Sequence, residues 1–282
     1  MVAAGALGYR WARQARSAKP GDEAMTDLAT TSTGMVRVET RGAVRILRMH
    51  RPEKLNALNT DMLVALQAAL QEAERDDAVR ALVLTGEGRG FSAGADLAEF
   101  RGERTPESVK RNMLRSELMG SIQVMLRTMS KPVVAAVHGA AIGGGAAFAA
   151  CCDMVVAADN VKLGYPELMH HLTPTGVMTS LIKQVGPKTA FELISLGATL
   201  GAEEALRIGL VNRVVAADAV LEAALTIANA WAELDPVQMA ATKNMFYRMT
   251  ELSFEQGLAL GRDVSVAMRH LAAATANAKP AA

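Results

Sequence analysis

Apolar residues near the start of the chain occupy every second position and then change to a helical spacing. The alternating positions flank a polar turn at residues 40–42 and are Val36, Val38, Val44 and Ile46. This pattern predicts a β-hairpin with one solvent-facing side. The helically spaced positions are Leu63, Leu66, Leu70 and Ala73. They predict an amphipathic helix, with Thr60 as its N-cap.

Short apolar runs at residues 81–84, 133–137 and 155–158 predict buried strands, and the first two run into glycine-rich turns. Strands that alternate with helices indicate βαβ units, with ligand sites where strands end in such turns. After Thr173 the spacing is mostly helical, apart from a short strand predicted at 211–215. Helical segments are expected after Pro174, Pro187, Asp218, Pro236 and Ser253 and over residues 202–208.

The length of 282 residues suits one large α/β domain with a helical C-terminal part. We place a soft boundary near residue 220, which gives a core at 35–220 and a helical region at 221–282. Lys and Arg total 30 against 29 Asp and Glu, a net charge of +1. Such a balance provides no field that would gather nucleic acid or an anionic membrane.

The stretch 132–152 has no charged residue and is long enough to cross a bilayer. The glycines at 143–145 instead favour a buried strand, a turn and a buried helix. Cys151 and Cys152 are adjacent within this stretch, which suits neither a disulfide framework nor a zinc site. We therefore expect two reduced core cysteines, no metal site and no membrane partner.

Before Asp22 the chain has basic residues and no acidic ones, on an alanine-rich background. Residues 1–34 are interpreted as a disordered leader or an over-extended start, because Met25 and Met35 are alternative first residues. The expected location is cytoplasmic, or an organelle matrix if the basic segment is a transit peptide.

Two glycine-rich turns, at residues 91–97 and 141–148, each follow a predicted strand and open toward a helix. Backbone N–H groups at such helix starts lack an internal partner and can face a developing anion. Each turn alone is a weak signal, since small residues also relieve close packing.

Five motifs, in their residues and in their order along the chain, resemble those of the enoyl-CoA hydratase/isomerase (crotonase) family. They are Arg51-Pro-Glu-Lys-Leu-Asn-Ala-Leu58, Ser92-Ala-Gly-Ala-Asp96, Gly143-Gly-Gly145, Pro166-Glu167 and Ala205-Leu-Arg-Ile-Gly-Leu-Val211. The resemblance runs from about Val36 to the C-terminus. It implies a crotonase-like fold of repeated ββα units, with a core sheet and a helical C-terminal part.

The resemblance also implies the site. Backbone N–H groups of Ala95 and Gly144 are expected to form an oxyanion hole for a CoA thioester, which is the substrate and not a resident cofactor. The backbone around Ala57 and Ala93 is expected to contact CoA. Lys54, Arg89 and Arg101 are candidates for its phosphates or are solvated surface charges.

Hydratases of this family use two glutamates, and this chain departs from that pattern. The first position is Ala147, whereas the second is retained as Glu167. One carboxylate can shuttle a proton between two carbons, as in enoyl-CoA isomerases, but hydration also requires an oriented water and a proton donor. The alternatives are a hydratase or lyase in which His170 or His171 replaces the missing acid, and a non-catalytic acyl-CoA-binding protein.

Three further expectations concern other polar residues and the C-terminal helices. Asp96 is expected to cap its turn, and Asp153 to close the following helix or to pair locally. Residues 100–119 are treated as loop positions that set the depth of the acyl pocket, with Thr173 and Thr175 nearby. The apolar faces of the C-terminal helices need a partner surface, and the family resemblance implies a homotrimer or a dimer of trimers.

Overall fold

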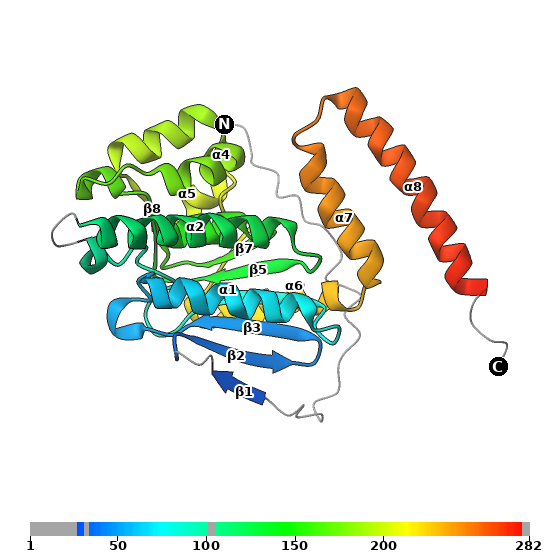
Figure 1. Ribbon diagram of the computed structural model, residues 1–282, viewed down its shortest axis with the longest axis horizontal. Helices are drawn as coiled ribbons and strands as arrows, with labels where there is room; N and C mark the ends of the chain where they lie inside the picture. The colour runs from blue at the N-terminus through cyan, green and yellow to red at the C-terminus, as the bar shows by residue number, and fades with distance from the viewer. Residues whose placement is uncertain (1–26, 31–33, 101–104, 278–282) are drawn as a thin grey trace.

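The computed structural model describes residues 27–30, 34–100 and 105–277 (Figure 1). Most of the expected leader at 1–34 lies outside these ranges, and so does Arg101. Within them the main sheet has seven strands in the order β1-β2-β3-β4-β5-β7-β10. Their bounds are β1 Asp27–Thr30, β2 Val36–Arg41, β3 Val44–Met49, β4 Ala81–Gly86, β5 Val133–Val137, β7 Met154–Ala158 and β10 Arg213–Val215.

The pairing changes direction across this sheet. β1, β2 and β3 pair antiparallel, which confirms the predicted hairpin. From β3 through β4, β5 and β7 to β10 each pair is parallel. A second sheet of the described residues holds three short strands, β6 (Ala140–Ile142), β8 (Lys162–Gly164) and β9 (Thr199–Leu200). Neither β6 nor β8 nor β9 was predicted, because runs of two or three residues carry no recognisable period.

Helices follow pairs of strands, as a fold of ββα units requires. α1 (Thr60–Arg75) follows β2 and β3, α3 (Gly144–Cys151) follows β5 and β6, and α4 (Thr175–Leu196) follows β7 and β8. The remaining helices are α2 (Pro106–Thr128), α5 (Ala202–Arg207), α6 (Val220–Ala232), α7 (Pro236–Met249) and α8 (Phe254–Asn277). α4 is kinked at Gly186, where φ is +77°, so Pro187 begins its second half as the sequence predicts.

Both faces of the main sheet are buried, and alternate residues of β4 supply the two sides. Leu82 and Leu84 join a large core with α1, α2, α3 and α4. Ala81 and Val83 face the opposite way and pack beneath α6. Burial on both faces explains why this parallel strand is apolar at every position from 81 to 84. Because α6 covers the sheet, packing of the core continues past residue 220, where we placed the boundary.

Three local predictions need correction. The N-cap of α1 is Asn59, whose side chain accepts a hydrogen bond from Met62 N at 3.0 Å, and Thr60 is the first helical residue. Most of the range 100–119 is helix α2, which begins with a capping box between Thr105 and Ser108. Asp153 pairs across the molecule with Lys243 of α7, at 2.7 Å, because α7 packs beside α2.

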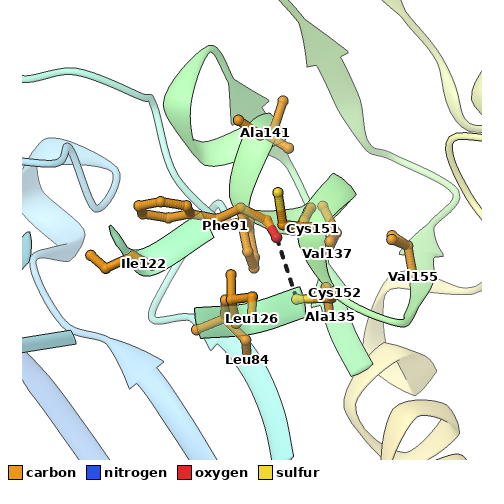
Figure 2. Close-up of a cluster of buried hydrophobic side chains, with 14 of the residues drawn as sticks. Leu84, Phe91, Ile122, Leu126, Ala135, Val137, Ala141, Cys151, Cys152 and Val155 are labelled. Atoms are coloured by element: carbon orange, nitrogen blue, oxygen red, sulfur yellow. Dashed lines mark hydrogen bonds between the residues drawn. The ribbon is translucent and has the colours of Figure 1, made fainter. Parts of the chain in front are cut away.

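The uncharged stretch 132–152 forms β5, β6 and α3, inside the core (Figure 2). Cys151 and Cys152 are free and buried, and Cys152 Sγ lies 3.3 Å from the carbonyl oxygen of Phe148. Burial raises the pKa of the Cys151 thiol to about 11, which keeps it protonated and unreactive near neutrality. In the described part of the chain no helix is long and apolar enough to cross a membrane.

Candidate active site

The two glycine-rich turns lie side by side, held by backbone hydrogen bonds. Ser92 N donates to Ala140 O, and Ile142 N donates to Ser92 O, each at 2.9 Å. Gly94 crosses so close to Ile142 that an added Cβ would lie 2.5 Å from its carbonyl oxygen, and its φ is +81°. Only glycine fits this crossing, which is the physical reason for the glycine in the first turn.

A buried asparagine from the first motif supports the same turn. The Asn56 side chain donates to the carbonyl oxygens of Glu87 and Gly90 and accepts from Arg51 N. Ser92 Oγ donates to Asn56 O at 2.9 Å and accepts from Gly94 N at 3.2 Å. This network connects residue 56 with the backbone next to Ala95, so the two motifs form one unit.

Arg51 and Asp96 close this unit from the other side. Arg51 Nη1 lies 2.5 Å from Asp96 Oδ2, and Asp96 Oδ1 accepts from Ala98 N at 3.0 Å. Asp96 therefore caps its turn, as expected, and also forms an ion pair that the sequence did not indicate.

Ala95 and Gly144 line one and the same cavity. Gly144 is the first residue of α3, and Gly143 precedes it with φ +51°. Among the described residues no backbone carbonyl accepts from either N–H. Two N–H groups without a backbone acceptor, one of them at a helix N-terminus, are the kind of donors that can stabilise a developing oxyanion.

Glu167 is the carboxylate of this cavity. It begins the short 3₁₀ segment Glu167–His170. Three residues earlier, Gly164 O accepts a hydrogen bond from Gly143 N at 2.8 Å, which ties this segment to the second glycine-rich turn. Glu167 Oε2 is buried without a hydrogen-bond partner. Burial raises the pKa of Glu167, and neither its own backbone N–H nor the charge of His170 reverses that direction. A carboxylate with one unpartnered oxygen and a raised pKa suits a general base.

The cavity has a volume of about 510 Å³ and lies between α2 and the start of α4. Apolar and polar side chains share its wall; they include Leu58, Phe100, Asn112, Arg115, Ser116, Met119, Gln123, Leu172, Thr173 and Thr175. A narrower cavity of about 70 Å³ adjoins it and is lined by Ala93, Ala95, Glu167 and His170, among others. The volume and mixed wall suit a small organic group that carries some polar atoms.

Comparison with known proteins gives the family. The family model described as enoyl-CoA hydratase/isomerase matches residues 39–275. The chain belongs to this family. It is therefore an acyl-CoA enzyme of the crotonase superfamily, and its α/β structure with two sheets and a C-terminal helical part is a crotonase fold.

Several relatives are similar over most of their length. A putative enoyl-CoA hydratase of Thermus thermophilus is 37% identical over 80% of this chain and 88% of its own. A short-chain-enoyl-CoA hydratase of Clostridium acetobutylicum is 36% identical over 79% and 85%. Among solved structures, an enoyl-CoA hydratase of Bacillus anthracis superposes with a TM-score of 0.78, at 28% identity over 84% of this chain and 91% of that one. A monofunctional enoyl-CoA isomerase of M. smegmatis has a TM-score of 0.67, at 31% identity over 79% and 97%.

The structure brings the three catalytic candidates, Ala95, Gly144 and Glu167, to one cavity. Ala147 is fully buried in α3. Among the CoA-contact candidates, Ala93 lines the narrow cavity, Ala57 is buried nearby, and Lys54 is exposed at the end of a 3₁₀ turn. His170 and His171 are both exposed, and His170 also borders the narrow cavity. Within the described ranges no cluster of His, Cys, Asp and Glu could hold a metal ion.

The sequence analysis placed residues 100–119 at the acyl pocket but missed that most of them belong to helix α2. The available signals were Pro106 after a threonine N-cap and the spacing of Leu118, Ile122 and Leu126, which are buried on one side. Exposed apolar residues such as Met113 and Val124 obscured that spacing.

Proposed function

We propose that the protein is an enoyl-CoA isomerase that moves a double bond along the acyl chain. The observation that supports this proposal is the single carboxylate of Glu167, with its unpartnered Oε2, in the same cavity as Ala95 and Gly144, together with alanine at position 147. A base and an oxyanion hole are sufficient for proton transfer between carbons, and water activation needs a further group.

In this reaction Glu167 removes a proton from C2 of a 3-enoyl-CoA. The electron pair of the C–H bond moves into a dienolate, and the thioester oxygen takes the negative charge. The N–H groups of Ala95 and Gly144 donate to that oxygen. Removal of one such donor typically lowers the rate about 10²–10³-fold. The protonated Glu167 then returns the proton to C4, which gives the 2-enoyl-CoA and restores the base.

The remaining parts of the substrate follow from the same placement. The backbone at Ala57 and Ala93 would meet CoA, and Lys54 would lie near its phosphates. The apolar residues exposed on α7 and α8, such as Phe246, Phe254 and Leu258, support a homo-oligomer, for which a trimer or a dimer of trimers is our proposal. Figure 1 shows these two helices beside the α/β body.

A hydratase is the second candidate, because His170 borders the narrow cavity together with Glu167 and Ala95. The relatives named as hydratases also support it. In that reaction His170 would supply the proton that Glu167 alone cannot supply while it activates water.

The deciding experiment offers purified protein matched 3-enoyl-CoA and 2-enoyl-CoA thioesters and follows products by mass and chromatography. The isomerase converts one into the other without gain of water, and Glu167→Gln lowers that rate roughly 10²–10⁴-fold. Glu203→Gln, on the exposed side of α5, is the matched control and keeps the rate. Addition of water that is lost in His170→Ala would replace the isomerase with the hydratase.

Binding of both thioesters with no double-bond migration in either would contradict the proposed isomerase.

A further inference from the structure

Arg115 is a charged residue inside the cavity that the proposed reaction does not use. It lies on α2, is only 4% exposed, and lines the same cavity as Glu167 and Gly144. Its guanidinium carbon lies 4.6 Å from the centre of the Phe100 ring, which also faces the cavity. Burial lowers the pKa of this guanidinium, although Glu99 beside it opposes the shift. The charge is therefore held in a poorly hydrated place.

One protein carboxylate neutralises this charge but leaves most of its donors free. Arg115 Nη1 donates to Glu99 Oε2. The same carboxylate accepts from Thr60 N at 3.0 and 3.2 Å and from Thr60 Oγ1 at 3.2 Å, which fixes it at the start of α1. An arginine has five N–H donors. Over the described residues, none of the others on Arg115 has a protein acceptor, and none of its nitrogens belongs to the buried atoms without a partner. These donors therefore keep some accessible surface, on a side chain that lines the cavity.

A purely hydrocarbon acyl chain would be a poor neighbour for this group. A chain that filled the cavity would exclude water from the free N–H donors and give them no acceptor, which is unfavourable. An oxygen on the chain would accept from them and avoid that penalty, and a carboxylate would do so with charge assistance. Asn112 and Ser116, within one turn of Arg115, make the same part of the wall polar.

We infer that Arg115 selects acyl chains that carry an oxygen acceptor, a hydroxyl or a carboxylate, beyond the reacting carbons. The inference rests on the proposed function only in placing the thioester at Ala95 and Gly144 and the acyl chain in the cavity.

Arg115 also has a plain structural role to be separated from this one, since its bond to Glu99 ties α2 to the segment Leu97–Phe100. Two variants separate the roles. Arg115→Met removes the donors and keeps an unbranched side chain against Phe100. Glu99→Gln removes the protein carboxylate and leaves Arg115 in place, so it frees the guanidinium for a substrate oxygen.

The test measures binding by calorimetry at one fixed ionic strength, with saturated thioesters that have no double bond to move. The ligands are hexanoyl-CoA, 6-hydroxyhexanoyl-CoA and adipoyl-CoA, with the four- and eight-carbon series alongside. We expect the native protein to bind at least one oxygen-bearing thioester roughly 10- to 100-fold more tightly than the hydrocarbon of equal length. In Arg115→Met that preference disappears, and hexanoyl-CoA binds at least as tightly as it does to the native protein. In Glu99→Gln the preference for the carboxylate increases.

Two results would overturn the inference. If the native protein binds the hydrocarbon thioester as tightly as both oxygen-bearing ligands at every chain length, it makes no such selection. If Arg115→Met or Arg115→Gln weakens the binding of all ligands equally, the residue has a structural role alone. Because no turnover is measured, failure of the isomerase proposal leaves a chain-end preference visible, and loss of the preference leaves double-bond migration to be measured separately.

Discussion

Oε1 of Glu167 lies directly against the backbone of Gly143, the residue before the proposed donor Gly144. A Cβ built on Gly143 would come within 2.7 Å of that oxygen, and Gly143 has φ +51°. The absence of a side chain at Gly143 therefore leaves room for the proposed base beside the turn that carries the proposed donor. This contact joins two segments 24 residues apart in sequence, at 143 and 167, in the proposed reacting centre.

Gly143→Ala is expected to damage activity more than stability. The backbone of Gly143, with φ +51° and ψ −119°, lies in a sparsely populated region that would cost an alanine about 1–3 kcal/mol, and displacement of the carboxylate by the new methyl group lowers kcat/KM roughly 10²-fold. Thermal unfolding and steady-state kinetics measure the two effects. Gly257→Ala in α8 is the control, because its nearest neighbour is the flexible Met249 side chain at 3.9 Å. Full activity in Gly143→Ala would contradict the proposed arrangement of base and turn.

The raised pKa of Glu167 predicts a pH dependence of both activity and stability. The base acts in its ionised form, so kcat/KM rises with pH through a pKa above that of an ordinary glutamate. Folding favours the protonated form, and the stabilisation from Glu167 is complete below the unfolded pKa and is lost as pH rises through the folded pKa. At neutral pH we therefore expect Glu167→Gln to be at least as stable as the native protein.

Urea denaturation of both proteins across mildly acidic to neutral pH checks this prediction. The native protein should lose stability relative to Glu167→Gln as pH increases. A difference that is constant with pH, together with a rate profile that lacks an acid limb, would show that Glu167 is not the titrating base.

Asn56→Ala is expected to destabilise the protein, because the Asn56 side chain supports the first glycine-rich turn. It removes the bonds to Glu87 O and Gly90 O and the acceptor for Arg51 N, all at a fully buried residue. Each buried group left without a partner costs about 1–3 kcal/mol, so the free energy of unfolding should fall by roughly 3 kcal/mol or more. Chemical denaturation measures it.

Asn160→Ala is the matched control, since Asn160 is exposed and accepts only from Gly139 N, at 3.2 Å. It should cost less than about 1 kcal/mol. Equal losses in the two variants would show that Asn56 has no special part in holding the turn.

The buried pair Lys243–Asp153 is expected to anchor α7 to the core. Lys243 is 5% exposed and also donates to Leu126 O and Lys131 O, and Tyr247 OH donates to Asp153 at 2.9 Å. Lys243→Met leaves a buried carboxylate without its counter-charge, at a cost of about 3–5 kcal/mol. Lys183→Met breaks the exposed pair with Glu251 and should cost at most about 1 kcal/mol.

Denaturant midpoints of the two lysine variants give the comparison directly. The catalytic constants of folded Lys243→Met should match those of the native protein, because none of the three residues of this cluster lines the cavity. A small stability loss in Lys243→Met would mean that the pair is hydrated and does not anchor α7.

The sequence predicts those parts of the fold whose signal is local. The strands at 81–84 and 133–137 have apolar residues at every position because both faces are covered, and α1 has one apolar side because only that side meets the sheet. Ala95, Gly144 and Glu167 were found through motifs, which record the backbone and chemical requirements of one short turn at a time. The N-cap of α1 was displaced by one residue because Asn59 and Thr60 are both good caps.

Only the tertiary structure decided which of these local pieces meet. That Glu167 Oε2 has no partner, that Arg115 faces the acyl cavity, and that Asp153 pairs with Lys243 all depend on contacts between distant segments. Burial and hydrogen-bond satisfaction are properties of the packed molecule, because the sequence alone does not distinguish a charged residue that faces water from one that faces a core. The sequence by itself thus determined the elements and the type of chemistry, whereas packing determined the environment of each charged group.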